Sequence, residues 1–475
     1  MEHEVFSNSN IELQPLSNKK VWGFATGTLG EYFVYYLFYT YFLYFLTDYV
    51  LVPAAIAGTI MSIAMIWDAM TDPIVGYIND VSKNPKGRRR PMMLYTFIPF
   101  CLTFFLCFLR PGLEGTALYV YYAVVCLAFW LMFTTQQVPF YGLLPEIAQY
   151  DNDRMRIRSA MGFIGNAGNL AVSIVPIALS TVIALGVSEM TAWPIVMGIL
   201  GVIGCGGFVV CWYTTRGMET PPEKVIRPEG NLFQTYGRII RLKGYIVTVL
   251  VYFICTINLC LIFASIMYVA DNKLGLQPLQ QSIVVACYTF SGALFAPFIA
   301  AIARRVGSLK AFEIIMLIGA ILFTLCGFIG LNSFGIMVFH GIVTGGVFAL
   351  ATGFNYGLFY QVIDLAYLKR DEQVEGSAIS FATFGYKIGA ATAAFFLGIA
   401  LSIIGYDGAS DVNAEVLGRL DSLLTFMPAV LLVIVFLMLV FLYPIKQNLY
   451  DLILAAKAKK VNGETYSKEG IEKLF

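Results

Sequence analysis

Charged side chains are scarce in this sequence. Only 13% of the 475 residues are charged, whereas 58% are hydrophobic. A soluble domain of this size and composition would have far too little polar surface. The formal net charge is +1, and the lysines and arginines stand in short separate clusters rather than in one polybasic stretch. The composition therefore predicts a membrane protein and argues against nucleic acid as a partner.

Cysteine motifs and catalytic motifs are also missing. All nine cysteines fall inside apolar runs, with no CxxC pair and no nearby pair of histidines, which argues against a disulfide framework or a zinc site. We interpret them as small helix-packing residues. The sequence contains no metal cluster, nucleophile–base pairing or phosphate-binding loop, so we expect no enzymatic activity and no cofactor. The polar N-terminus lacks a cleavable signal pattern, and we expect the first span to be retained.

Long apolar stretches make up most of the chain. About 20 apolar residues are needed to cross roughly 30 Å of hydrocarbon, and twelve stretches meet that need. The predicted spans are residues 21–46, 53–78, 91–109, 117–143, 160–185, 192–213, 245–270, 281–303, 311–331, 334–363, 377–404 and 423–444. The sequence thus predicts an all-α membrane protein with twelve transmembrane helices.

The lysines and arginines between the spans are distributed very unevenly. Basic residues are retained on the cytoplasmic side of short loops. The loops on one side, together with both termini, carry most of them, whereas the loops on the other side carry just Arg110, Lys273 and Arg419. We therefore expect both termini to be cytoplasmic in a cell (inner) membrane, which requires an even number of spans.

The longest charged connection divides the spans into two groups of six. It covers residues 214–244 and separates an N-terminal bundle at 21–213 from a C-terminal bundle at 245–445, with tails at 1–20 and 446–475. Two six-helix bundles are the outline of many secondary transporters. The predicted architecture is a two-bundle carrier that works by alternating access.

Two carboxylates stand in the second predicted span, where charges are costly. Asp68 and Asp72 are four residues apart, which places both on one face of a helix, one turn apart. A charge within the bilayer costs a few kcal/mol or more, and two adjacent carboxylates do not both stay ionised without a compensating charge. We expect the pair to hold a cation. The hydroxyls of Thr71 and Thr134 complete an oxygen set suited to sodium.

Lys387 is a basic residue within the eleventh predicted span. With Glu31 of the first span, it lies at about the depth of Asp68. Its ammonium is an alternate partner that releases the carboxylates when the cation binds. The competing interpretation is a fixed ion pair that only holds the two bundles together.

Tyrosines line one face of the first predicted span. Tyr32, Tyr35, Tyr36 and Tyr39 are spaced three and four apart, so their rings align along the helix. Tyrosine rings that face a cavity can stack on a sugar. The alternative for each of these four rings is packing between helices. Uncharged polar residues on other spans are either ligand contacts or hydrogen-bonding groups between helices. The candidate solute-binding residues are Glu31, Tyr32, Tyr35, Gln137, Asn166, Asn355 and Lys387.

Three segments resemble one family of carriers. The second span and its loop read Trp67-Asp68-Ala69-Met70-Thr71-Asp72-Pro73-Ile74-Val75-Gly76, then Asn79-Asp80 and Gly87-Arg88-Arg89-Arg90-Pro91. The fourth span ends on Pro139-Phe140-Tyr141 and Leu144-Pro145-Glu146, followed by Asp151 and Arg154, and Lys387 precedes Gly389-Ala390-Ala391. Together they resemble the glycoside-pentoside-hexuronide cation symporters, the melibiose-carrier-like branch of the Major Facilitator Superfamily.

The resemblance has consequences for the fold and for the site. It implies the Major Facilitator Superfamily fold, with two six-helix bundles around a central cavity. It also implies that Asp68, Thr71, Asp72 and Thr134 occupy the family's cation site, and that Lys387 links this site to the substrate.

The chain departs from the galactoside-transporting members of that family. Glu31-Tyr32 stands where those members carry a Lys-Asp pair, Gln137 stands for their span-four Asp, and their span-five Arg aligns near Gly162. Met65 replaces an Arg that precedes the aspartates, which leaves the order of cation use open. The set of side chains that grips galactosides is therefore largely absent.

Charged residues also cluster in the loops of the basic side. Asp80, Arg88, Arg89, Glu146 and Arg154 are candidates for a gate whose charge clusters close the cytoplasmic side and break as the bundles rock. The alternative is that the arginines only enforce topology.

The function expected from these features is cation-coupled symport of a sugar or glycoside-like polar solute, with sodium or a proton as the coupling ion. The expected partners are that small solute, a glycoside, pentoside or uronide, and membrane lipid, with no obligatory protein partner. Two alternatives stay open. One is a cation-coupled carrier of the same fold for a lysophospholipid or another amphipathic solute, and the other is a membrane sensor or enzyme built on a transporter body.

Overall fold

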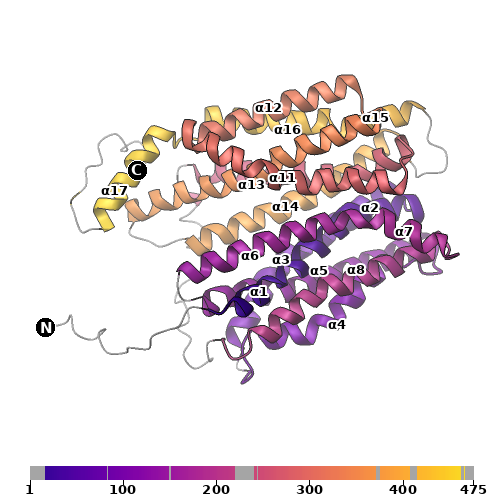
Figure 1. The fold of residues 1–475 in the computed structure, drawn as a ribbon, viewed down its shortest axis with the longest axis horizontal. Coiled ribbons are helices and arrows are strands. Elements are labelled where there is room, and N and C mark those ends of the chain that lie inside the picture. The colour runs from indigo at the N-terminus through magenta and orange to yellow at the C-terminus, as the bar shows by residue number, and fades with distance from the viewer. Residues whose placement is uncertain are drawn as a thin grey trace.

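The computed structural model describes residues 16–82, 84–148, 151–219, 240–242, 244–370, 375–406, 414–461 and 465. Every regular element in these ranges is a helix. Figure 1 shows the helices running side by side along the long axis, with those of the first half in one layer and those of the second half in the other. The described residues therefore confirm the all-helical prediction.

The first half begins with a span built from short pieces. Two π-helical segments, η1 and η2, interrupt the α-helical stretches of this span, and a short 3-10 segment, η3, joins α6 to α7. The elements are α1 (Asn18–Ala25), η1 (Leu29–Phe33), α2 (Val34–Tyr44), η2 (Phe45–Tyr49), α3 (Ala54–Val81), α4 (Arg90–Cys107), α5 (Gly115–Ile147), α6 (Asp151–Ala171), η3 (Val172–Ile174), α7 (Val175–Ala184) and α8 (Glu189–Thr214).

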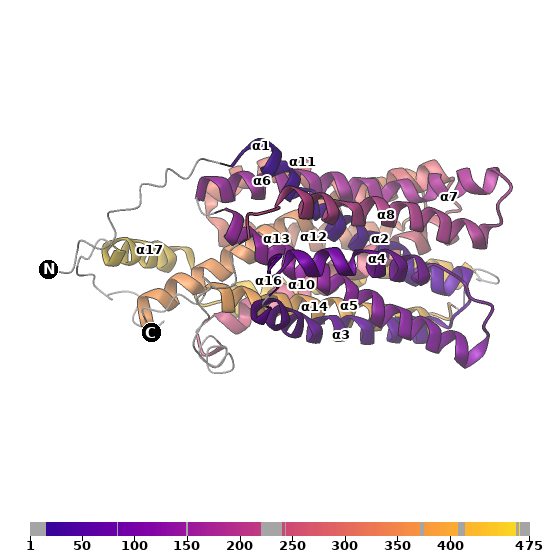
Figure 2. The same cartoon turned by 90° about the horizontal axis from the view of Figure 1, so that it is seen from below.

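The second half contains longer uninterrupted helices, of which α13 has 37 residues. Its elements are α10 (Tyr245–Met267), η5 (Tyr268–Lys273), α11 (Pro278–Val306), α12 (Ser308–Ile329), α13 (Phe334–Arg370), α14 (Glu375–Ile403), α15 (Ala414–Leu424), α16 (Phe426–Leu437), η6 (Met438–Leu442) and α17 (Gln447–Val461). The final helix, α17, lies at one end of the helix layers, beside the end of α13 (Figure 2).

Nine helices of the described chain are long and apolar enough to cross a membrane, by length and composition. They are Ala54–Asn79, Arg90–Cys107, Gly115–Leu144, Arg156–Ala184, Glu189–Thr214, Tyr245–Lys273, Ser308–Ile329, Thr383–Ile403 and Glu415–Leu442. The other three predicted spans, at 21–46, 281–303 and 334–363, coincide with α1 to η2, with α11 and with α13. The structure therefore supports a multi-pass helical protein, and the count of twelve stays a prediction.

The two ends of the helix layers differ in charge, and we name them the basic end and the far end. The basic end holds the loop at Arg88 and the start of α1, which is held by a hydrogen bond of 2.9 Å from Arg156. At the same end, Lys457 of α17 pairs with Asp364 of α13 at 2.5 Å. The far end holds Asp48, which follows α2. The first and the last described helix thus both lie at the basic end.

Aromatic side chains fill the interior of the first half. Phe38 of α2 stacks on Phe129 of α5 with ring centroids 4.8 Å apart, and Trp130 packs edge-on against Phe38 at 5.4 Å. All three side chains are buried. In lipid, close packing rather than the hydrophobic effect drives helix association. This ring cluster therefore fixes α2 against α5, the two helices that flank the site described below.

The two halves approach most closely where α3 passes α14. A Cβ added to Gly58 of α3 would lie 2.7 Å from the carbonyl oxygen of Ala394 and 2.8 Å from the Cα of Gly398, both on α14. Small residues at a helix crossing let the backbones come this close. The contact lies toward the far end and sets α3, which carries both predicted cation-site carboxylates, against α14, which carries Lys387.

Candidate functional site

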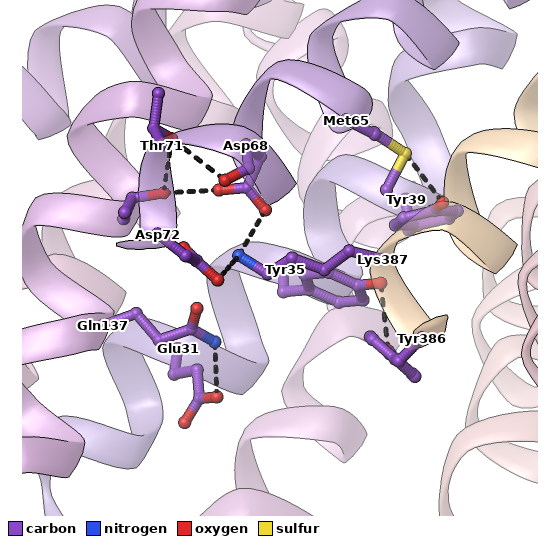
Figure 3. Close-up of polar contacts among 11 residues, drawn as sticks. Glu31, Tyr35, Tyr39, Met65, Asp68, Thr71, Asp72, Gln137, Tyr386 and Lys387 are labelled. Atoms are coloured by element: carbon purple, nitrogen blue, oxygen red, sulfur yellow. Dashed lines mark hydrogen bonds and ion pairs between the residues drawn. The ribbon is translucent and has the colours of Figure 1, made fainter. Parts of the chain in front are cut away.

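A cluster of three charged residues lies between the two halves (Figure 3). The Lys387 ammonium of α14 is 2.6 Å from Asp68 Oδ2 and 2.7 Å from Asp72 Oδ2, both on α3. Because the aspartates are one helical turn apart, both carboxylates reach the same nitrogen. Asp68 and Lys387 are only 2% and 6% exposed, and an unpaired charge at that depth would be very costly. When both carboxylates are ionised, the single ammonium leaves the cluster with one uncompensated negative charge.

Threonine hydroxyls complete the predicted cation-binding set. Thr134 of α5 donates a hydrogen bond of 2.5 Å to Asp68 Oδ1. The Thr71 hydroxyl donates to the backbone carbonyl of Asp68 at 3.0 Å and lies 3.4 Å from the Thr134 hydroxyl. Asp72 Oδ1 is buried and accepts no hydrogen bond from any described residue. The structure thus brings all four predicted residues together, with the Lys387 ammonium among them.

The chemistry of this donor set suits a hard cation. Carboxylate and hydroxyl oxygens are the ligands that such ions prefer, and the described residues contain no group of three or more His, Cys, Asp or Glu that would suit another metal. The ammonium of Lys387 already contacts one oxygen of each aspartate. A monovalent cation bound here would therefore compete with Lys387 for the same oxygens.

A second polar cluster surrounds Glu31, which lies in η1. Gln137 Nε2 donates to Glu31 Oε1 at 2.9 Å, and the Tyr141 hydroxyl donates to Oε2 at 2.6 Å. Gln137 and Tyr141 are four residues apart on α5 and so share one face of that helix. Figure 3 shows Glu31 and Gln137 beside the charged cluster. Tyr141 was not among the predicted site residues, although its spacing from Gln137 could have identified it.

Two of the four tyrosines on the first span link the halves. Tyr35 accepts a hydrogen bond of 3.0 Å from Tyr386 of α14. The Tyr39 hydroxyl lies 2.8 Å from the carbonyl oxygen of Ala390, also on α14, and 2.9 Å from Met65 Sδ on α3. The geometry of both residues therefore fits the alternative of packing between helices. Tyr39 holds together the two helices that carry the charged cluster.

The remaining predicted solute contacts lie outside these two clusters. The Tyr32 side chain is 38% exposed, and a Cβ added to Gly165 of α6 would lie 3.8 Å from its ring. Asn166, the next residue on α6, is exposed. Asn355 of α13 is fully buried. The binding roles of these residues stay predictions.

The predicted gate residues are described in part. Arg88 Nη2 is 2.5 Å from Glu146 Oε1, and Arg89 pairs with the same carboxylate. The backbone N–H groups of Arg88 and Arg89 donate to Glu219 Oε1 at 2.6 and 2.5 Å, a contact that was not predicted. These contacts join α4, α5 and the segment after α8. The side chains of Asp80 and Arg154 lie outside the described residues, so the gating role stays a prediction.

Hydrogen bonds also join the two halves at the far end, and we did not predict them. Asp48 Oδ1 accepts a hydrogen bond of 2.7 Å from Asn272 and a second from Tyr406, while Thr47 and Tyr268 share one of 2.8 Å. Tyr44 donates to a carboxylate oxygen of Asp271. We name this set the far-end latch; its members are Tyr44, Thr47, Asp48, Tyr268, Asp271, Asn272 and Tyr406.

Replacing Asp48 with alanine should open the far end. The change removes two hydrogen bonds between the halves, each worth about 1.5–3 kcal/mol when the acceptor is charged. Leu113 and Leu279 are exposed far-end residues of the first and the second half. Spin labels attached at these two positions, in a protein without the native cysteines, would report the distance between the halves by pulsed electron paramagnetic resonance. The population with the longer distance should rise by tenfold or more.

The Glu415–Arg419 pair provides a matched control for the Asp48 variant. Its two side chains are 71% and 52% exposed and are paired within one helix at the same end. Such surface pairs contribute little, so Glu415→Gln should leave the distance distribution unchanged. An Asp48→Ala protein with the wild-type distribution would show that the latch does not hold the halves together.

Comparison with known proteins supports a transport role for this chain. A model of the family described as MFS/sugar transport protein matches residues 23–447. The chain is 26% identical over 437 residues to an uncharacterized symporter of Bacillus subtilis (strain 168), covering 90% of this chain and 92% of that protein. It is 23% identical over 427 residues to a putative glycoside/cation symporter of Escherichia coli (strain K12), covering 89% and 91%.

Solved structures show the same arrangement of helices. The chain matches the crystal structure of a mutant of the nucleoside transporter NupG with a TM-score of 0.66 at 13% sequence identity, covering 90% of this chain and 100% of that one. At that identity the likeness shows the fold alone. Together with the family match, it confirms the Major Facilitator Superfamily fold that the sequence resemblance implied.

Proposed function

The chain belongs to the family of MFS/sugar transport proteins, and from this premise we propose that it is a cation-coupled symporter of a sugar or a glycoside-like polar solute. The match to this family and to a putative glycoside/cation symporter bears out the resemblance noted in the sequence, and the family is one of transporters rather than enzymes. The proposal includes twelve spans in two six-helix bundles. It places the basic end, with both termini, in the cytoplasm.

The observation that carries this proposal is the position of Lys387. Its ammonium lies within 2.7 Å of both aspartates of α3, so the lysine compensates the carboxylates when no external cation is bound. A sodium ion or a proton that reaches Asp68 and Asp72 takes over that role and frees the ammonium. The displaced lysine is then free to move with α14.

The latch and the helix crossing fit one state of an alternating-access cycle. The far-end latch and the Gly58–Gly398 contact both close the side opposite the basic end. With the basic end in the cytoplasm, this is a state closed toward the outside. Both the charged cluster and the latch must break for solute to enter from that side. The binding of the cation is therefore coupled to the binding of the solute when both ligands favour the same closed state. Each ligand then raises the protein's affinity for the other by the same factor.

Replacing Asp72 with cysteine should abolish cation-dependent uptake while the protein is still expressed. The variant retains one carboxylate, which Lys387 compensates fully, so no negative charge remains to attract an external cation. Uptake into membrane vesicles would be measured with and without a sodium gradient, using a panel of radiolabelled glycosides and pentosides.

Glu189→Gln, at an exposed position on the first turn of α8, is the control that should keep the sodium response. If the Asp72→Cys protein responded to sodium as the wild type does, the cation site would have to lie elsewhere.

A further inference from the structure

We propose that the transported solute is an uncharged polyhydroxylated molecule, such as a neutral glycoside or pentoside, and that the site discriminates against anionic sugars such as uronides. The inference rests on the proposed function and narrows it by the charge of the substrate. It depends on the balance of charges along the spans and on the hydrogen bonds of Glu31.

Acidic residues outnumber lysine and arginine within the twelve predicted spans. Across all of these spans the sequence has Lys387 as the single lysine or arginine, against the four acidic residues Glu31, Asp68, Asp72 and Glu313. Glu313 lies 3.9 Å from Lys446, outside the two central clusters. The centre of the protein therefore contains three carboxylates and one ammonium.

The one central ammonium is already engaged. Lys387 lies 2.6 and 2.7 Å from Asp68 and Asp72, and among the described residues no lysine or arginine forms an ion pair with Glu31. When all three carboxylates are ionised, they outnumber the two positive charges even after one monovalent cation has joined the charged cluster. An anionic solute would then have to bind beside a net negative charge in a low dielectric, where like charges repel strongly.

The contacts of Glu31 suit hydroxyl groups. Its two oxygens accept hydrogen bonds from neutral donors, Gln137 at 2.9 Å and Tyr141 at 2.6 Å. Each carboxylate oxygen has a further lone pair that can accept from a solute hydroxyl. The Gln137 carbonyl and the Tyr141 hydroxyl can take part in the same network. This set is rich in acceptors for hydroxyl hydrogens and offers no cationic group to a carboxylate.

The charge of the solute is tested by matched pairs of sugars. Purified full-length protein in sodium chloride would be titrated with methyl glucoside and methyl glucuronide, with methyl galactoside and methyl galacturonide, and with lysophosphatidylcholine, and the shift in unfolding temperature recorded. At least one neutral sugar should stabilise the protein. Its uronide counterpart should need at least a tenfold higher concentration for the same shift.

The outcomes separate this inference from the function it rests on. A uronide that binds as well as its neutral partner, with a sodium-dependent shift, overturns the inference and leaves the symporter proposal standing. A shift with the lysolipid alone, or with no compound of the panel, overturns the glycoside assignment and the inference with it.

Variants of Glu31 test the cause of the discrimination. Glu31→Gln should reduce the tenfold gap between neutral and anionic sugars to threefold or less, because it removes one negative charge while the amide still bonds hydroxyls. Gln137→Arg, which adds a cation beside Glu31, should also reduce the gap between neutral and anionic sugars. It replaces the first variant in the test if Glu31→Gln does not fold. Glu114→Gln, at an exposed far-end position, should keep the gap. An unchanged gap in both site variants would contradict the proposal.

Discussion

Replacing Lys387 with methionine should make the stability of the protein depend on added sodium or lithium. The substitution keeps an unbranched apolar side chain but removes the ammonium that lies between Asp68 and Asp72. Loss of one partner from a buried ion pair costs about 3–5 kcal/mol, because the other charge is left buried and uncompensated. A cation that binds at the two carboxylates would restore the balance. It would also bind more tightly than in the wild type, because its competitor is gone.

The measurement is the unfolding temperature in sodium chloride and in choline chloride at equal ionic strength. Lys387→Met should unfold at a much lower temperature in choline than in sodium, and the wild type should differ less. Lys273→Met is the matched control, since Lys273 pairs with a single carboxylate, that of Asp421, at 2.5 Å and both side chains are nearly buried. It should be destabilised equally in both salts. Equal destabilisation of the Lys387 variant would support a fixed structural ion pair.

Replacing Gly58 with alanine should lower transport by at least tenfold. The added Cβ would meet the Ala394 carbonyl oxygen at 2.7 Å and the Gly398 Cα at 2.8 Å. Both are backbone atoms, so no side chain can rotate away, and α3 must separate from α14. Overpacking of this kind costs about 1–3 kcal/mol. The state closed at the far end therefore becomes less populated, and the carrier has difficulty completing its cycle.

The same helix provides the control for Gly58. A Cβ added to Gly76 of α3 would meet nothing closer than 3.9 Å, where it approaches Val138, so Gly76→Ala should transport at close to the wild-type rate. Uptake rates of the two variants would be compared at equal amounts of protein in the membrane. If the Gly58 variant transported as fast as the Gly76 variant, the close crossing would have no part in the cycle.

The charged cluster was predictable because its signals are rare and local. A carboxylate in an apolar span stands out, and a spacing of four places Asp68 and Asp72 on one face without any knowledge of the fold. Thr71 could be predicted because it lies on the same helix as the two aspartates. Predicting Lys387 and Thr134 also required an estimate of depth in the membrane and the resemblance to a known family. The structure brings all five of these residues together.

The far-end latch was not predictable from the same signals. Asp48 and Asp271 lie at the ends of predicted spans, where an acidic residue normally faces water and needs no partner. Their contacts join positions more than 200 residues apart, such as Asp48 with Asn272, and only the packing of the two halves brings these together. Of the two partners of Glu31, Gln137 was predicted as a site residue and Tyr141 was missed, although Tyr141 lies four residues from Gln137 on the same face of α5.

The interrupted first span has a consequence for how this carrier moves. Its wide turns, η1 and η2, hold Glu31 in one case and Thr47 and Asp48 in the other. In a π-helical turn, a backbone carbonyl bonds the N–H group five residues ahead instead of the one four residues ahead. A switch between these two partners moves the π-bulge along the helix by one residue. Glu31, a candidate solute-binding residue, and Asp48 of the far-end latch thus belong to one interrupted span, whose length and twist can change within the span. Part of each transport cycle can take place inside one helix, without any rotation of a whole bundle.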